Sequence, residues 1–219
     1  MIPVNEIFQT LQGEAHWTGT PSLFIRLQGC RIGCPWCDTK YTWENRLDQI
    51  VRSDIMLLKQ KDSSTYAKMS VDELMETISG FQSRHIVLTG GEPAQYDLTE
   101  LTKRITDSGK SVQIETSGTY DVKVNHLTWV TVSPKVNMPG GFKVLPESIK
   151  LADEIKMPVG KMVDIETLQQ VLGMRYDNDY EVWLQPLSQS RKATDLCIEQ
   201  ARRYGWRVSL QTHKFSGLR

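Results

Sequence analysis

Three cysteines lie within eight residues of one another, Cys30, Cys34 and Cys37, in the spacing Cys-x3-Cys-x2-Cys. Each of three thiolates on one short loop can bind one iron of a four-iron cluster, whose complete ligation takes four cysteines. One iron then stays open to an exogenous ligand, and an open coordination site is what metal catalysis requires. The fourth cysteine, Cys197, falls in a segment whose apolar spacing predicts a helix, and we expect it to be a buried free thiol. The spacing therefore predicts a 4Fe-4S cluster with one vacant corner.

Two other uses of the thiols compete with this interpretation. Zinc could be bound if His16, His85 or another residue completed a tetrahedral site, but no Cys-x2-Cys or His-x3-His partner motif is present. A redox pair formed by Cys34 and Cys37 would leave Cys30 unexplained. The redox interpretation leaves one clustered thiol unused and the zinc interpretation lacks a partner motif, so the spacing favours the iron–sulfur cluster.

Polar side chains also stand near the beginning of the chain. Gln12 supplies an amide that can donate and accept, and Glu14 supplies a carboxylate acceptor. Arg26 lies between Ile25 and Leu27 inside an apolar stretch, where a charged residue needs a partner or a polar cavity. Its planar guanidinium suits a carboxylate, but a strand whose other face meets solvent would explain the arginine equally well.

Segments of strand-like and helix-like pattern alternate along the chain. Seven short segments rich in β-branched or aromatic residues are expected to be strands: Leu23–Leu27, His85–Thr89, Val112–Thr116, Thr128–Val132, Glu154–Met157, Glu181–Gln185 and Arg207–Gln211. Helices are expected between several of them, and their apolar stripes end near Gly80, Gly109, Gly173 and Gly205. Ser70 and Glu73 form a capping-box pattern at the start of the first helix. Residues 45–68 fit neither period and are expected to be an insertion with some helix near Ile55–Leu58.

Strands that alternate with helices predict a parallel sheet, which binds its ligand at the carboxyl ends of the strands. Unusual polar residues follow most of the predicted strands: Cys30, Gly90-Gly91-Glu92, Ser117-Gly118, Ser133-Pro134-Lys135, Gln185-Pro186 and His213-Lys214. We expect them to face one common site, although loops are polar in most proteins. Two glycines let the backbone approach a ligand. Glu92 can accept a hydrogen bond from an ammonium group, or it can simply begin a helix with favourable charge.

Composition narrows the class of protein. The 219 residues carry 26 Lys and Arg against 26 Asp and Glu, so the formal charge is zero, which argues against a chain that binds a nucleic-acid backbone. The longest apolar run, Ile55–Leu58, is far too short to span a bilayer, and no secretory signal is visible. A single cytoplasmic α/β domain, with no direct binding to nucleic acid or membrane, is expected.

The cysteine spacing, with the aromatic Trp36 before the last cysteine, resembles the radical S-adenosylmethionine (SAM) superfamily. The resemblance implies an incomplete (β/α) barrel in which SAM binds the open iron and, after reduction, yields a 5′-deoxyadenosyl radical. Residues that match the superfamily's SAM site follow the predicted strands: Gly91, Glu92, Ser117, Ser133, Pro134, Lys135 and Gln185.

Six ordered motifs, including Phe8-x-Thr10-x-Gln12-Gly13-Glu14 and Gln211-Thr212-His213-Lys214, are together similar to the 7-carboxy-7-deazaguanine synthase family of queuosine biosynthesis. The resemblance implies a lyase that converts 6-carboxy-tetrahydropterin to 7-carboxy-7-deazaguanine by hydrogen abstraction, ring contraction and loss of ammonia. The residues that would hold the substrate are Leu11, Gln12, Gly13, Glu14, Arg26, Thr89 and His213. Thr39 would bind the Mg²⁺ on which the family depends. No residue is assigned as a catalytic acid or base.

The same resemblance implies a homodimer and an external one-electron donor such as flavodoxin. The chain departs from the family at Ala15, where the motif usually continues with glycine. If that position needs a positive φ, alanine is strained there by roughly 1–2 kcal/mol.

Two functions from other classes remain as alternatives. An activase that takes hydrogen from a glycine of a partner protein would share the cysteine loop and Gly90-Gly91-Glu92, but has no use for Gln12, Glu14 and Arg26. A sensor that only binds an iron–sulfur cluster or zinc would not respond to SAM.

Overall fold

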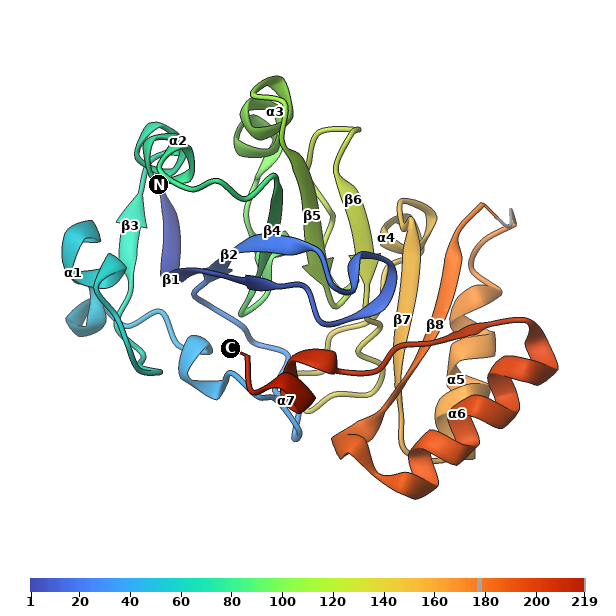
Figure 1. The fold of residues 1–219 in the computed structure, drawn as a ribbon. Coiled ribbons are helices and arrows are strands. Elements are labelled where there is room, and N and C mark those ends of the chain that lie inside the picture. The colour runs from blue at the N-terminus through green and yellow to red at the C-terminus, as the bar shows by residue number, and fades with distance from the viewer. Residues whose placement is uncertain (177–178, 219) are drawn as a thin grey trace.

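The computed structural model describes residues 1–176 and 179–218. Its strands are β1 (Ile2–Leu11), β2 (Pro21–Leu27), β3 (Ala67–Met69), β4 (His85–Gly90), β5 (Ser111–Thr116), β6 (Trp129–Val132), β7 (Glu154–Val159), β8 (Glu181–Pro186) and β9 (Arg207–Val208). In the described residues they form one sheet in the order β3-β1-β2-β4-β5-β6-β7-β8-β9. Neighbours from β2 to β9 are parallel, and β1 is antiparallel to both β2 and β3. The strand order ends at β3 and β9 without closing, which confirms the expected incomplete (β/α) barrel (Figure 1).

Helices cover the outside of the curved sheet (Figure 1). The α-helices are α1 (Ser53–Leu57), α2 (Val71–Ser79), α3 (Thr99–Asp107), α4 (Pro146–Lys150), α5 (Met162–Leu172), α6 (Arg191–Tyr204) and α7 (Thr212–Ser216). Short 3-10 helices are η1 (Ala15–Trp17), η2 (Lys40–Thr42), η3 (Leu47–Gln49), η4 (Pro93–Gln95) and η5 (Leu187–Gln189). No helix of the described residues is long and apolar enough to cross a membrane.

The predicted strands that form the middle of the sheet are present within two residues of the expected bounds. Ile86, Val87 and Leu88 of β4 are all fully buried, as in a parallel strand that is covered on both faces. The capping box of α2 is also present, since Glu73 N donates to Ser70 Oγ and Ser70 N donates to the Glu73 carboxylate. Apolar runs and local caps therefore suffice to place these elements.

Two strands were not expected from the sequence. β1 has six buried residues in a row, but Asn5 and Glu6 interrupt its apolar pattern, so no period of two is visible. Residues 45–68 contain η3 and α1 and run into β3, a strand of only three residues. Helix is present near Ile55, as expected, but the interpretation of this segment as an insertion remains a prediction.

Differences also occur at the C-terminal end. The strand expected over Arg207–Gln211 ends at Val208. Ser209 N makes one more bond to β8, to the Leu184 carbonyl, and the chain then leaves the sheet and enters α7 at Thr212. Neither α7 nor α4 was expected, and each has only five residues, too few for an apolar period. In α6, Cys197 is fully buried, as expected from the sequence, whereas the neighbouring Ile198 is 46% exposed.

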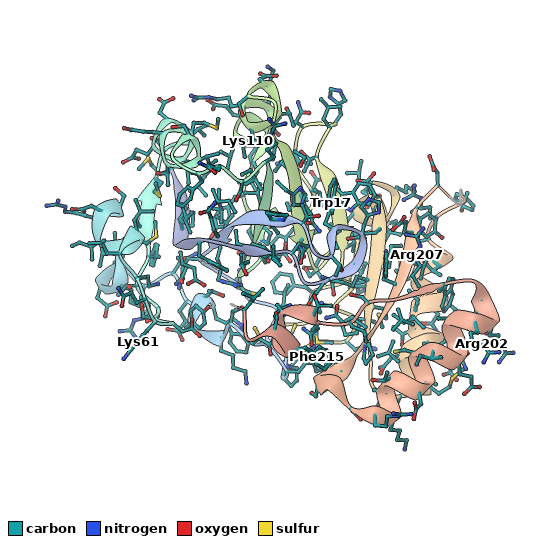
Figure 2. All side chains as sticks on the ribbon, in the orientation of Figure 1. Trp17, Lys61, Lys110, Arg202, Arg207 and Phe215 are labelled. Carbon is teal, nitrogen blue, oxygen red and sulfur yellow. The ribbon has the colours of Figure 1, made fainter. Side chains whose placement is uncertain are left out.

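The two ends of the strands have different character. At the N-terminal end, Trp17 stacks on His85 and lies edge-to-face with Trp129, which fills the end of the barrel with aromatic rings. At the carboxyl end, α7 carries the exposed Phe215. Figure 2 shows Trp17 and Phe215 toward opposite ends of the sheet. The cysteine segment that follows β2 lies at the same end as α7 (Figure 1), and Lys214 and Asp38 link the two with an ion pair of 3.1 Å.

Candidate active site

A cavity of about 380 Å³ opens at the carboxyl ends of the strands. This volume suits a small organic ligand. All the residues that the sequence predicted for the cluster, SAM, Mg²⁺ and substrate line this cavity except Pro134. Residues that stand up to two hundred positions apart are thus brought to one site, as the parallel sheet predicted.

The cysteine loop leaves β2 and is fixed by backbone hydrogen bonds to the segment that follows η2. Cys30 N donates to the Trp43 carbonyl at 2.9 Å, and Cys37 N donates to the Cys34 carbonyl at 3.1 Å. The Trp43 indole N–H also donates to Cys37 Sγ at 3.4 Å. None of the three thiols is in a disulfide, and all three line the cavity. The donor set therefore fits an iron–sulfur cluster, whose ligands are cysteine thiolates.

The thiols lie in a partly desolvated environment. Burial raises the pKa of the Cys30 thiol to about 11, despite a hydrogen bond from the backbone of Ile32. Burial likewise raises the pKa of Cys34, although the positive charge of Lys135 opposes the effect. A coordinating thiol is deprotonated by its metal regardless of such shifts. Free thiols of this kind are poor nucleophiles, which disfavours a redox role for the pair Cys34 and Cys37.

The histidines that the zinc interpretation would use already have other partners in the structure. His85 is engaged by Ser111 at 2.9 Å and by Gln113 at 3.1 Å, and His16 pairs with Glu181 at 3.2 Å. Cys197 is fully buried in α6, and burial raises its pKa to about 12, as expected for a free thiol of the core.

Two glycines bring the end of β4 into backbone contact with the start of the cysteine loop. Gly91 N donates to the Leu27 carbonyl at 2.9 Å, and Glu92 N donates to the Gly29 carbonyl at 2.8 Å. A Cβ on Gly91 would fall far inside contact distance of the Gly29 backbone. Gly90 has a φ of +99°, which favours glycine. The glycines are thus required by the approach of two chain segments.

Glu92 is almost completely buried and is held by three donors. It accepts from Thr116 Oγ1 at 2.6 Å, from Ser117 N at 2.8 Å and from Ala94 N at 3.0 Å. The last bond caps η4, so the helix-start interpretation is correct. A carboxylate has about four acceptor positions, so one remains for the ammonium group that the sequence analysis expected.

Ser133 and Lys135 lie together beyond β6. Lys135 Nζ donates to the carbonyl oxygen of Ser133 at 2.8 Å and to its hydroxyl at 2.5 Å. Burial lowers the pKa of Lys135, while the nearby Cys34 thiolate raises it. Pro134, between them, does not line the cavity. The two polar side chains therefore face the cysteine loop as a pair.

Glu14 also lines the cavity and is surrounded by donors. Its Oε2 pairs with Lys156 Nζ, and its Oε1 accepts from Gln211 at 2.8 Å and from Gln185 at 3.3 Å. Burial would raise the pKa of Glu14, but the charge and hydrogen bond of Lys156, the bond from Gln211 and the charge of His213 lower it to about 2. Glu14 is therefore an ionised carboxylate inside the protein.

Gln12 extends this network into the barrel. Its Nε2 donates to Glu115 Oε1 at 3.0 Å and to Gln113 Oε1 at 3.2 Å. Glu115 also receives Lys156 at 3.5 Å. No role in the site was predicted for Glu115, Lys156 or Gln211. Lys156 is a charged residue between apolar neighbours in a strand, which is the pattern by which Arg26 was selected. The same criterion would have selected Lys156 from the sequence.

Arg26 lines the cavity but is already paired. Its Nε donates to Glu6 Oε1 at 2.6 Å, and the guanidinium lies over the Phe8 ring at 5.6 Å. Tyr41 also donates to Glu6, at 3.1 Å. A charged residue inside an apolar strand needs a charged partner or a polar cavity. Arg26 has both, because it pairs with the buried Glu6 and lines the cavity.

The remaining predicted residues close the cavity. Thr39 lies 3.7 Å from Cys37 Sγ through its hydroxyl, and Leu11 and Thr89 lie in the walls. His213, on α7, packs so closely on Gly13 that a Cβ there would overlap its ring. Thr212 N fixes this contact by donating to the Gly13 carbonyl at 3.0 Å. The C-terminal helix is thus bound to the segment that carries Glu14.

Ala15 has a φ of +53°, so the positive φ suspected at this departure from the motif is present. Its N–H donates to Ser209 Oγ at 2.9 Å. An L-residue in this conformation is strained by roughly 1–2 kcal/mol. The strain lies directly beside Glu14.

Comparisons with known proteins agree with this geometry. The model of the Radical SAM superfamily matches residues 24–135. The 7-carboxy-7-deazaguanine synthase of Escherichia coli (strain K12) is 50% identical over 216 residues, which cover 97% of each chain. That of Buchnera aphidicola subsp. Schizaphis graminum (strain Sg) is 45% identical over 221 residues and 99% of each chain. The crystal structure of QueE from Escherichia coli has a TM-score of 0.93 at 49% identity and covers 96% of this chain and 93% of that one.

Proposed function

The chain belongs to the 7-carboxy-7-deazaguanine synthase family of the radical SAM superfamily, and we propose that it converts 6-carboxy-tetrahydropterin to 7-carboxy-7-deazaguanine with loss of ammonia. One observation carries the proposal: the cysteine loop and the charged cluster around Glu14 line the same cavity. The residues that would hold the cluster and the residues that would hold the substrate therefore belong to one site. Queuosine biosynthesis is the pathway that this product implies.

Cys30, Cys34 and Cys37 would hold the cluster, and SAM would fill its vacant corner. Bound together and reduced by one electron, the two groups supply a carbon-centred radical that abstracts hydrogen. The amino-acid and nucleoside parts of SAM would be held by Gly91, Glu92, Ser117, Ser133, Lys135 and Gln185. Pro134 does not line the cavity, and we propose only that it holds the backbone between Ser133 and Lys135.

The substrate would lie against Leu11, Gln12, Gly13, Glu14, Arg26, Thr89 and His213. A pterin presents a guanidine-like edge of N–H donors, and the ionised Glu14 can accept two of them. The substrate carboxylate needs a positive partner, which Arg26 or Mg²⁺ can supply. The hydrogen bond from Arg26 Nε to Glu6 fixes the orientation of the guanidinium group, which also lines the cavity.

Mg²⁺ would be held by the Thr39 hydroxyl, with substrate oxygens and water as its further ligands. The hydroxyl faces the cavity near Cys37, and Asp38 beside it is paired with Lys214. A hydroxyl oxygen in the cavity lining near Cys37 fits a cation that would neutralise a substrate carboxylate.

The protein's surroundings are part of the proposal. We infer a cytoplasmic homodimer that receives electrons from an external donor such as flavodoxin, with no direct contact to nucleic acid. The single domain with an insertion at about residues 45–68 is also retained as an inference.

Anaerobic reconstitution followed by mass spectrometry of the products tests the function. The reconstituted protein is expected to convert 6-carboxy-tetrahydropterin to 7-carboxy-7-deazaguanine, with a new deazapurine absorbance. Arg26→Ala is expected to retain SAM cleavage but to lose productive turnover, because the substrate carboxylate is no longer held. SAM cleavage by the native protein without this product would favour the activase, and zinc without sulfide would favour the sensor.

A further inference from the structure

Lys156 is a buried cation that the proposed function has not used. It lies in β7 between Ile155 and Met157, and its side chain is 5% exposed. Transferring an ammonium group from water into a protein interior is strongly unfavourable unless the charge is paired and hydrogen-bonded. Its position in the strand directs it to the cavity, where it meets carboxylates from two other parts of the chain.

The partners of Lys156 are Glu14, which precedes η1, and Glu115 of β5. The Glu14 pair joins residues 142 positions apart, and the Glu115 pair measures 3.5 Å. The side chains are 14% and 21% exposed, so both carboxylates are largely removed from water but open to the cavity. One cation thus stands between two acids, and all three side chains line the cavity.

Glu14 also has a fixed orientation. Donors reach it from β7 through Lys156, from β8 through Gln185 and from the segment before α7 through Gln211. Three elements therefore determine where its oxygens lie. A carboxylate held in this way is pre-organised for a ligand, because no side-chain rotation has to be restricted on binding.

The charge state of Glu14 depends on Lys156. Burial raises the pKa of a carboxyl group, and at Glu14 this effect is overcome chiefly by the charge and hydrogen bond of Lys156. If the cation is removed, the carboxyl group becomes neutral more readily. A neutral carboxyl group carries a donor where the ligand also presents donors, and two donors cannot bond to each other.

We propose that Lys156 is a positioning residue of the substrate site, which holds Glu14 as an oriented, ionised acceptor beside Glu115 and so selects ring systems that present a pair of N–H donors. This inference rests on the proposed function, which supplies the pterin as the ligand. Lys156 acts through the two carboxylates and not on the reacting atoms.

A double-mutant cycle tests the inference. Holoenzyme with cluster and SAM is titrated anaerobically with 6-carboxy-tetrahydropterin, for the native protein, Lys156→Met, Glu14→Gln and the double variant. Lys156→Met is expected to weaken binding about tenfold or more, while turnover at saturating substrate changes much less. In the Glu14→Gln background the same substitution is expected to change binding less than twofold, because Lys156 acts through Glu14.

Controls separate positioning from a general structural role. Lys192→Met, on the exposed face of α6, is the matched control and is expected to bind as the native protein does. Affinity for SAM is expected to change much less than affinity for the pterin in Lys156→Met, because the ion pairs of Lys156 are with Glu14 and Glu115, which are not among the residues proposed to hold SAM. If Lys156→Met cannot be recovered folded, Lys156→Arg and Lys156→Gln replace it, with expected losses of less than threefold and about tenfold.

Three outcomes would overturn the inference. If Lys156→Met binds the pterin with native affinity, the inference is wrong but the proposed function stands. The same holds if the losses of affinity from Lys156→Met and Glu14→Gln add fully in the double variant. A native protein that neither binds nor converts the pterin overturns the inference and the proposed function together.

Discussion

At the cysteine end of the cavity the chain is held mainly by its backbone, whereas at the Glu14 end it is held by charged side chains. Gly29, Gly91 and Trp43 take part in main-chain bonds that join the cysteine loop to the end of β4 and to the segment after η2. Glu14 instead depends on Lys156 and on two amides. The two ends therefore respond to different kinds of substitution.

The difference follows from what each end has to bind. A cluster brings its own rigid geometry and needs three sulfurs on a loop that can approach it closely, so glycines and main-chain bonds are sufficient. A flat heterocycle is distinguished by the pattern of its donors and acceptors, which only placed polar side chains can match. Backbone geometry thus serves the cofactor end, and electrostatics serves the substrate end.

The largest effect is expected for Cys34→Ala. Loss of one of three thiolates removes the ligand of one iron, so the variant should hold no intact 4Fe-4S cluster and should cleave no SAM. Iron and sulfide content with the visible absorbance measures this directly. Cys197→Ala is the matched control and should keep both metal and activity, because that thiol is buried in α6. Activity retained in Cys34→Ala would contradict the assignment of the ligand.

Gly91→Ala tests the backbone at the same end. The added methyl group would overlap the Gly29 backbone, which cannot move aside as a side chain can. We expect the free energy of unfolding to fall by about 3 kcal/mol or more, with loss of the cluster. Gly109→Ala has open space around it and should lose only about 1 kcal/mol through its positive φ. Equal losses in urea unfolding would show that the approach of the two segments is not important.

The same contrast explains what the sequence could predict. The cysteine loop and Gly90-Gly91-Glu92 are contiguous motifs, and apolar runs such as Ile86–Leu88 mark the buried strands, so the cofactor end and the middle of the sheet were found. β1 was missed because Asn5 and Glu6 are buried in it through tertiary contacts. Buried polar residues of this kind carry no local signal.

At the substrate end the motifs gave Glu14 but not its partners. Lys156 and Gln211 reach Glu14 across 142 and 197 positions, and spacing of that length says nothing about contact. For Arg26 the sequence left two explanations open, and only the structure shows both a partner and a cavity. Local chemistry is readable from one sequence, whereas ion pairs between strands need the topology.

Acid titration of stability should separate the Glu14 end from the rest of the core. The pKa of Glu14 is lowered from 4.5 to about 2 in the folded protein, so its stabilisation is complete above pH 4.5 and is lost as the pH falls toward 2. Glu14→Gln is expected to unfold about 3 kcal/mol more easily at pH 6, with the difference vanishing near pH 2. Urea unfolding at a series of pH values measures this.

For Glu154→Gln we expect the opposite pH dependence of the stability difference from the native protein. Burial raises the pKa of Glu154, against the hydrogen bond from Thr131 and the charge of Lys156, so its ionised form destabilises the folded protein at neutral pH. The stability of this variant relative to the native protein should therefore decrease as the pH falls. Parallel curves for the Glu14 and Glu154 variants would contradict the distinction.

A smaller effect is expected at the cluster from Trp43→Phe. The indole N–H donates to Cys37 Sγ, and a donor to a cluster sulfur stabilises the more negative, reduced state. Its loss should move the reduction potential to more negative values by up to about 60 mV, a tenfold change for one electron. A redox titration followed by electron paramagnetic resonance measures the shift. Trp36→Phe is the control, because Trp36 is 41% exposed. An equal shift of the reduction potential in both variants would show that the hydrogen bond from Trp43 does not cause it.

The smallest effect on stability is expected for Ala15→Gly, beside Glu14. Glycine relieves a strain of roughly 1–2 kcal/mol at φ +53° but loses a buried methyl group worth about 0.8 kcal/mol and gains freedom in the unfolded chain worth about 0.4–1 kcal/mol. These contributions nearly cancel, so the free energy of unfolding should change by less than about 1 kcal/mol.

The control for this prediction is Gly19→Ala. Gly19 has a φ of +86° and open space around it, so the added methyl group is not buried and the variant should lose about 1 kcal/mol of stability. Because Ala15 is adjacent to Glu14, its conformational restriction should matter more for the ligand: pterin affinity should fall severalfold in Ala15→Gly, while SAM cleavage without substrate stays native. Unchanged pterin affinity would mean that Glu14 is positioned by Lys156 and the two amides alone.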